Sequence, residues 1–144
     1  MEQRVSIITL GVSDLAASRA FYERLGWKCS TRMADEVVLF QLGSIVLSLF
    51  PRESLAREAH LPSEGSGFCG VALAYNTRST AEVDAVMEEA RTAGARILKA
   101  AQTAAWGGYS GYFSDPDGYV WEVAWNPGFE LADDGSVTLP EQPA

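Results

Sequence analysis

The segment YFSDPDGYVWEV, residues 112–123, decides the fold that this sequence predicts. Asp115-Pro-Asp-Gly118 has the composition of a tight turn, because proline fixes φ at the second position and glycine accepts a positive φ. Aromatic and β-branched residues flank this turn on both sides. We therefore expect a hairpin of two strands, Tyr109–Ser114 and Tyr119–Trp125.

The residues before this hairpin predict a strand, a helix and a further strand. Gly67–Tyr75 is an apolar run typical of a strand. Ser79 and Glu82 form a capping box that begins a helix, and Gly94 ends it. Arg96–Ala100 is the next expected strand. The second half of the chain therefore reads βαβββ.

The first half has the same order of elements. Val5–Val12 is rich in β-branched residues, and Ser13-Asp14 can cap the helix that follows, which Gly26 ends. Three expected strands come next: Lys28–Met33, Glu36–Leu42 and Ser44–Phe50. The repeat lies in the order of elements and not in residue identity.

The predicted fold is α+β, with two βαβββ modules forming a curled mixed sheet around a concave cavity. We expect one domain over residues 1–144, a length ordinary for a single domain. Module 1 covers about residues 5–50, a polar linker with a short helix covers 51–66, and module 2 covers about 67–127. Residues 128–144 form an acidic tail, expected to be docked or frayed.

Two stretches carry a family resemblance. Val12-Ser-Asp-Leu15, followed by Phe21-Tyr22 and Leu25-Gly26, and the segment 112–123 resemble the two signature stretches of the vicinal oxygen chelate superfamily. This group contains the glyoxalases, bleomycin-resistance proteins and extradiol dioxygenases. The resemblance covers about residues 5–127. It implies paired βαβββ modules, a homodimer, and a small-molecule ligand bound in cavities lined by the sheets.

The resemblance also implies where a metal would bind. In the metal-dependent members a divalent cation is held by His, Glu or Gln side chains, one from each of four strands. The corresponding positions here are Ile7, Ser48, Gly70 and Glu122, and only Glu122 is a residue of the ligand type. The single histidine, His60, falls in the linker. We therefore expect no metal and no other cofactor, with a non-standard divalent metal site as the less favoured alternative.

Glu122 then has two interpretations. A lone carboxylate that faces a mostly apolar cavity is a candidate acid or base, or the partner of a cationic ligand group. The alternative is a structural carboxylate, paired with an arginine or with backbone donors. The residues on either side, Trp121 and Val123, are expected to point to the opposite face of the sheet.

A cluster of aromatic residues supports a binding role. Six of them fall within residues 106–125: Trp106, Tyr109, Tyr112, Phe113, Trp121 and Trp125. Trp106 precedes Gly107-Gly108 and is a candidate lid, while Tyr109 and Tyr112 are candidate ligand-binding residues. Tyr109 and Tyr112 differ in strand parity, so both can face a cavity only if a bulge lies near Gly111. Alternatively, these aromatic residues belong to the core or to a dimer contact.

Charge and cysteine content restrict the partners. The net charge is −8, and residues 100–144 contain seven acidic residues and no Lys or Arg. An acidic chain without a basic cluster is not expected to bind nucleic acid or an anionic membrane. Cys29 and Cys69 are too few for a disulfide framework, so we expect a reduced, cytoplasmic protein.

Three functions follow as hypotheses. The leading one is a small-molecule-binding protein that has lost most metal ligands and sequesters an aromatic or cationic compound. The second is an enzyme of the lyase, isomerase or dioxygenase type, either cofactor-free with Glu122 as acid or base, or with a non-standard metal site. The last is an accessory domain that binds a protein partner.

Overall fold

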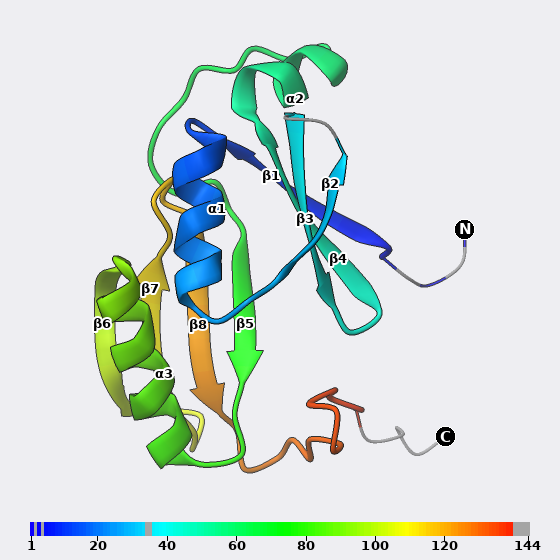
Figure 1. Cartoon of the computed structure of the whole chain (residues 1–144). Helices are drawn as coiled ribbons and strands as arrows, with labels where there is room; N and C mark the ends of the chain where they lie inside the picture. The colour runs from blue at the N-terminus through cyan, green and yellow to red at the C-terminus, as the bar shows by residue number, and fades with distance from the viewer. Residues whose placement is uncertain (2, 4, 34–35, 140–144) are drawn as a thin grey trace. The chain divides into compact units, whose positions relative to one another are not determined.

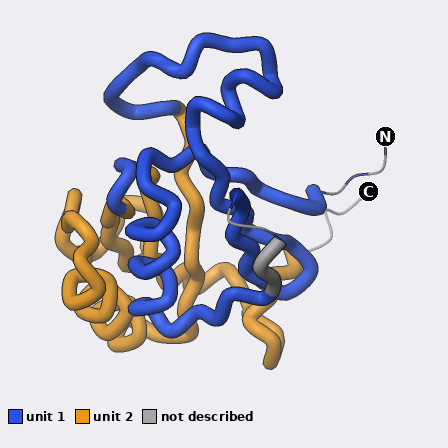
Figure 2. The backbone as a smooth tube through the Cα atoms, turned by 45° about the horizontal axis from the view of Figure 1, so that its top comes forward, with its two compact units in different colours: residues 1–69, 116–118 blue, residues 70–115, 119–144 orange. Residues whose placement is uncertain are grey.

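The computed structural model describes residues 1, 3, 5–33 and 36–139, with the side chains of residues 31–33 left undescribed. The chain divides into two compact units (Figure 2). Unit 1 comprises residues 1–69 with 116–118, and unit 2 comprises residues 70–115 with 119–144. The predicted linker therefore belongs to unit 1, together with the centre of the Asp115–Gly118 turn.

Unit 1 contains one four-stranded mixed sheet and two helices. Its elements are β1 (Ile7–Val12), α1 (Leu15–Arg24), β2 (Cys29–Met33), β3 (Val37–Leu42), β4 (Ile45–Pro51) and α2 (Arg52–Glu58). The strand order is β1-β4-β3-β2, with β1 parallel to β4 and the other pairs antiparallel. The predicted short helix is confirmed as α2, which packs on β1 and β4.

The core of unit 1 forms between α1 and one face of this sheet. Asp14 is the N-cap of α1 and its side chain accepts a hydrogen bond from the Ala17 N–H at 2.9 Å, as the sequence predicts. Phe21 and Tyr22 on α1 are fully buried. They share the core with apolar strand residues of alternating position: Leu10, Val12, Val38, Phe40, Leu47 and Leu49. Burial of this set, at roughly 1.5–3 kcal/mol for each side chain, holds the helix on the sheet.

Unit 2 repeats the arrangement with one helix. Its elements are β5 (Ala72–Asn76), α3 (Thr80–Ala93), β6 (Arg96–Thr103), β7 (Tyr109–Ser114) and β8 (Val120–Trp125). The strand order is β5-β8-β7-β6, and α3 lies along one face of this sheet (Figure 1). Val83 and Met87 of α3 are buried, as are Phe113, Trp121 and Val123 of the strands. Ser79 caps α3 and accepts from the Glu82 N–H, which confirms the capping residue.

The two βαβββ modules are confirmed, with two differences in the strands. β5 begins at Ala72 and not at Gly67, because Gly67 and Gly70 have φ values of +86° and +81°, in the left-handed region outside strand geometry. β6 continues to Thr103 and has register shifts against β7 after Ile97 and after Lys99. The predicted curled sheet is found as two four-stranded sheets.

Hydrogen bonds hold the predicted hairpin turn and part of the predicted tail. The Asp115 N–H donates to the Tyr119 carbonyl at 3.0 Å, while an Asp115 carboxylate oxygen accepts from the Tyr119 N–H at 2.9 Å. Within unit 1, a single carboxylate oxygen of Asp117 accepts from both the backbone N–H and the hydroxyl of Ser13, each at 2.8 Å. In unit 2 the Arg78 guanidinium donates to the carbonyls of Ala132 and Asp133, so this part of the tail is docked.

Residues 140–144 of the predicted tail lie outside the described residues. Within the part of the chain that is described, no helix is both long enough and apolar enough to cross a bilayer.

Candidate functional site

Glu122 lies on the face of the unit 2 sheet that points away from α3. It sits in β8, directly between Ala74 of β5 and Tyr112 of β7. Its chain neighbours Trp121 and Val123 are 7% and 0% exposed. Side chains alternate along a strand, so the carboxylate of Glu122 occupies the other face, where it is half-buried. The parity expected from the sequence is confirmed.

Tyr112 is the cross-strand neighbour of Glu122. Burial raises the pKa of the Tyr112 hydroxyl, and the hydrogen bond to Glu122 and its negative charge raise this pKa further. The phenol therefore stays protonated at neutral pH and can act as a hydrogen-bond donor beside the carboxylate.

The rest of this face is polar or small. The β7 register places Ser110 and Ser114 on the same side as Tyr112, and both serines are buried. The neighbouring positions on β5 and β8 are Ala72, Ala74, Asn76, Val120 and Ala124. Val120 is the largest apolar side chain of this group, and Ala124 is buried like the two serines.

Tyr109, one of the predicted ligand-binding residues, is not brought to this face. The β7–β8 register runs without a shift from Tyr109 to Ser114, so there is no bulge at Gly111 and the two tyrosines point to opposite faces. The Tyr109 hydroxyl donates to Asp84 of α3 at 2.7 Å, and this hydrogen bond raises the pKa of Tyr109. Tyr109 fastens α3 to the sheet.

Trp106 lies in the connection between β6 and β7 and is 51% exposed. The Ala104 N–H donates to the Gly108 carbonyl at 2.8 Å, and the Gly107 N–H donates to the Ala104 carbonyl at 3.0 Å. A Cβ at Gly108 would come within 1.8 Å of the Trp106 ring. The indole therefore rests on the bare backbone of Gly108 and keeps an accessible side, and its role as a lid stays a prediction.

Of the three other positions inferred from the resemblance, two lie in the strands of unit 1 and one lies just before the first strand of unit 2. Ile7 on β1 is 54% exposed, whereas Ser48 on β4 is buried. Gly70 precedes β5. The residue beside Ser48 on β1 is Thr9, which corresponds to Ala74 beside Glu122. The sequence could not indicate Thr9 or Ala74, because residue types do not reveal the register of a parallel strand pair.

The donor chemistry at these positions is sparse. Ile7 and Gly70 have no side-chain donor atom, Ser48 offers one hydroxyl and Glu122 one carboxylate. Across residues 1, 3, 5–33 and 36–139, no group of three or more His, Cys, Asp or Glu side chains could hold a metal ion.

Comparison with known families agrees with this fold. A family model described as the Glyoxalase/Bleomycin resistance protein/Dioxygenase superfamily matches residues 4–123. The chain belongs to this superfamily. None of the curated proteins matches the chain.

Solved structures of superfamily type resemble the chain over most of its length. A glyoxalase-related enzyme from Fulvimarina pelagi is 38% identical, with 97% of this chain and 100% of that one covered and a TM-score of 0.86. A lactoylglutathione lyase from Agrobacterium tumefaciens is 26% identical, with 90% and 100% covered and a TM-score of 0.68. A glyoxalase/bleomycin resistance protein/dioxygenase from Nocardioides is 25% identical, with 92% and 91% covered and a TM-score of 0.74.

Proposed function

We propose that this protein binds a small organic molecule on the face of the unit 2 sheet that carries Glu122 and Tyr112. The single observation that carries the proposal is the half-buried Glu122 carboxylate, which lies between Ala74 and Tyr112 on the sheet face away from α3. A half-buried carboxylate recognises a cationic group or a strong hydrogen-bond donor.

We propose further that binding needs no catalytic metal. A divalent ion such as Zn²⁺ requires three or four converging N, O or S donors at about 2.0–2.3 Å. The positions inferred for a metal provide one carboxylate and one hydroxyl between them. This donor set does not fit the ion of the metal-dependent relatives, so the chemistry of the site rests on Glu122 and its neighbours.

Trp106 supports an aromatic ligand. Its indole is half exposed, and two hydrogen bonds between Ala104, Gly107 and Gly108 close the turn that carries it, so stacking on the indole costs little further ordering. A cation that pairs with Glu122 would be held without chemical change, which is sequestration.

The experiment is a titration with benzylammonium, a small aromatic cation, followed by NMR. We expect Kd to rise about tenfold in Glu122→Gln, because a hydrogen bond to a charged group contributes about 1.5 kcal/mol. Glu89→Gln is the matched control, since Glu89 is exposed on α3, and it should leave Kd unchanged. Equal affinity in wild type and Glu122→Gln would overturn the proposal.

A second candidate function is catalysis, favoured by the 38% identity to a glyoxalase-related enzyme. Glu122 would act as a general base that takes a proton from one atom of the substrate and returns it to another. Such an isomerisation balances without a further reactant. Tyr112 would remain a hydrogen-bond donor throughout, since its raised pKa keeps it protonated.

The two candidates differ in the response to Glu122→Gln. Under catalysis, turnover of a substrate from a screen of carbonyl compounds should fall by about a hundredfold or more while substrate affinity changes little. Under sequestration, no compound is turned over by wild type and only affinity changes. Conversion of a bound compound by wild type but not by Glu122→Gln would favour the enzyme.

A further inference from the structure

Charged side chains are rare in the unit 2 sheet, and all of them fall on one face. The four strands β5–β8, which lie wholly within the described residues, contain three charged residues: Arg96, Lys99 and Glu122. Arg96 pairs with Ser114, and Lys99 pairs with Tyr112, which in turn pairs with Glu122. Directly opposed residues share a face. Both cationic side chains therefore lie on the same face as the Glu122 carboxylate.

The position of Lys99 depends on an irregularity in β6. Ile97 pairs with Phe113, whose ring stacks on Trp121 at 6.3 Å on the face covered by α3. In a regular strand Lys99 would follow Ile97 onto that face, two residues on. A register shift between them puts Lys99 opposite Tyr112 instead, because a bulge sets two residues against one. The bulge thus turns the lysine onto the face that carries Glu122, where the lysine is exposed.

The opposite charges are close but do not neutralise each other. Lys99 and Glu122 are separated by one intervening strand, so their backbones are about 10 Å apart. Tyr112, on the intervening strand, lies between them. Among the described residues no ion pair joins Glu122 to Lys99 or Arg96. The face therefore presents a negative group and, across the strand that carries Tyr112, a positive group.

We propose that the ligand of this face is a zwitterion, with an ammonium or similar cation at Glu122 and a carboxylate at Lys99. This inference rests on the proposed function and specifies its ligand class. A monocation satisfies Glu122 but brings no partner for Lys99. A molecule with both charges about 10 Å apart pairs with both side chains at once and can lie over the Tyr112 ring.

The test uses 8-aminooctanoate, whose extended chain separates the two charges by about 10 Å. The matched ligands are 8-aminooctanamide, which keeps the cation alone, and 4-aminobutanoate, which is too short. In NMR titrations at low salt we expect 8-aminooctanoate to bind about two- to fivefold more tightly than either, the size of one exposed ion pair. High salt should reduce this preference.

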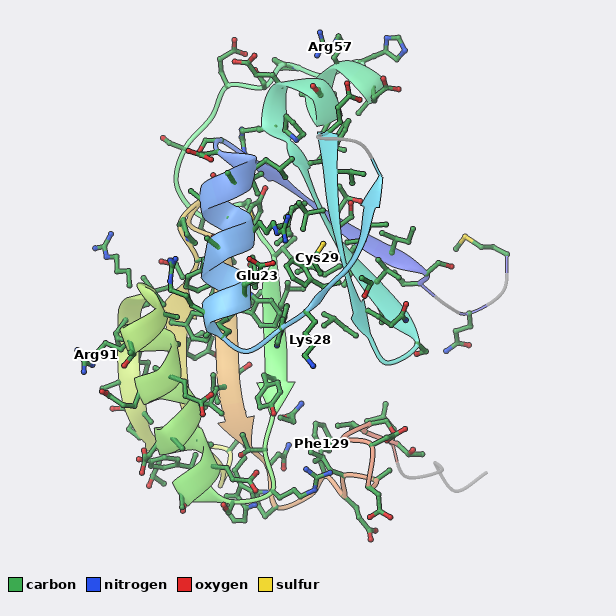
Figure 3. All side chains as sticks on the ribbon, in the orientation of Figure 1. Glu23, Lys28, Cys29, Arg57, Arg91 and Phe129 are labelled. Carbon is green, nitrogen blue, oxygen red and sulfur yellow. The ribbon has the colours of Figure 1, made fainter. Side chains whose placement is uncertain are left out.

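Variants of the two lysines test whether Lys99 causes the preference for the carboxylate. Lys28 is the other lysine of the chain, exposed in unit 1 between α1 and β2 (Figure 3), and serves as the matched control. Lys99→Gln should remove the preference for the carboxylate, Lys99→Arg should keep it, and Lys28→Gln should leave it unchanged.

The outcomes separate this inference from the proposed function. Cation binding that depends on Glu122, with no preference for the carboxylate or with a preference that survives Lys99→Gln, overturns the zwitterion alone. Failure of all three ligands to bind, or binding unaffected by Glu122→Gln, contradicts the proposed function and the inference with it.

Discussion

Replacement of Ser18 by alanine is expected to stabilise the protein, whereas most substitutions in a core destabilise it. The residue lies on α1 with 0% exposure, and its hydroxyl oxygen has no hydrogen-bond partner among the described residues. A buried polar group without a partner costs about 1–3 kcal/mol, because it gives up its hydrogen bonds to water. Ser18→Ala removes that cost and keeps the Cβ, so we expect a more stable protein.

The magnitude follows from three contributions. For a single hydroxyl we take the lower part of that range, so relief of the unpaired group contributes about 1–2 kcal/mol, and the higher helix propensity of alanine adds about 0.5 kcal/mol. The missing oxygen leaves a void of about 15 Å³, which costs about 0.4 kcal/mol at the usual rate for cavities. The free energy of unfolding should therefore rise by about 1–2 kcal/mol, and Tm by about 3–8 °C.

The same substitution at Ser79 is the control, with the opposite sign. The Ser79 hydroxyl caps α3 by accepting from the Glu82 N–H at 3.2 Å, and loss of such a cap costs about 1 kcal/mol. Urea unfolding of wild type, Ser18→Ala and Ser79→Ala should give equal m-values, with midpoints that move up and down respectively. A lower midpoint for Ser18→Ala would refute the reasoning, since it would mean that the hydroxyl has a stabilising partner.

The remaining predictions concern the site and the turn. Because the pKa of Tyr112 is raised, the protonated phenol contributes to stability below about pH 10, and this contribution is lost as pH rises through the raised pKa. Glu122→Gln should lower the pKa of Tyr112 in a tyrosinate absorbance titration, and an unchanged titration would contradict the interaction between the two side chains. Gly108→Ala places a methyl group 1.8 Å from the Trp106 ring and 2.6 Å from the Trp125 carbonyl, so it should cost about 1–3 kcal/mol and shift indole fluorescence to the red, which thermal unfolding and emission spectra will check. Asp117→Ala removes the acceptor of two 2.8 Å hydrogen bonds from Ser13 and should cost about 1–3 kcal/mol in urea unfolding; Asp14→Ala gives the comparison with a simple N-cap.

The sequence predicted the fold where local signals and side-chain alternation agree. Asp14, Ser79 and Gly94 mark helix ends by their own chemistry, so the limits of α1 and α3 follow from residue type. Glu122 was placed on the face opposite Trp121 and Val123 because these residues flank it in a regular strand. Both inferences need only neighbouring residues.

What the sequence could not predict depends on backbone geometry or pairing. The two register shifts in β6 decide which face receives Lys99, and no residue type near Lys99 signals them. Tyr109 was assigned to the ligand on composition, whereas its contact with Asp84 requires the placement of α3 on the sheet. Gly67 and Gly70 resemble strand residues in an apolar run, and only their positive φ values show where β5 begins.

The central claim, that Glu122 binds a small organic molecule without a metal, is tested most directly by one titration. Benzylammonium is titrated into wild-type protein before and after exhaustive treatment with a chelator, with Glu122→Gln in parallel. We predict the same Kd before and after chelation, and a Kd about tenfold higher in Glu122→Gln. Loss of binding on chelation that Zn²⁺ or Ni²⁺ restores, with Glu122→Gln unable to recover it, would contradict the claim and indicate a metal site.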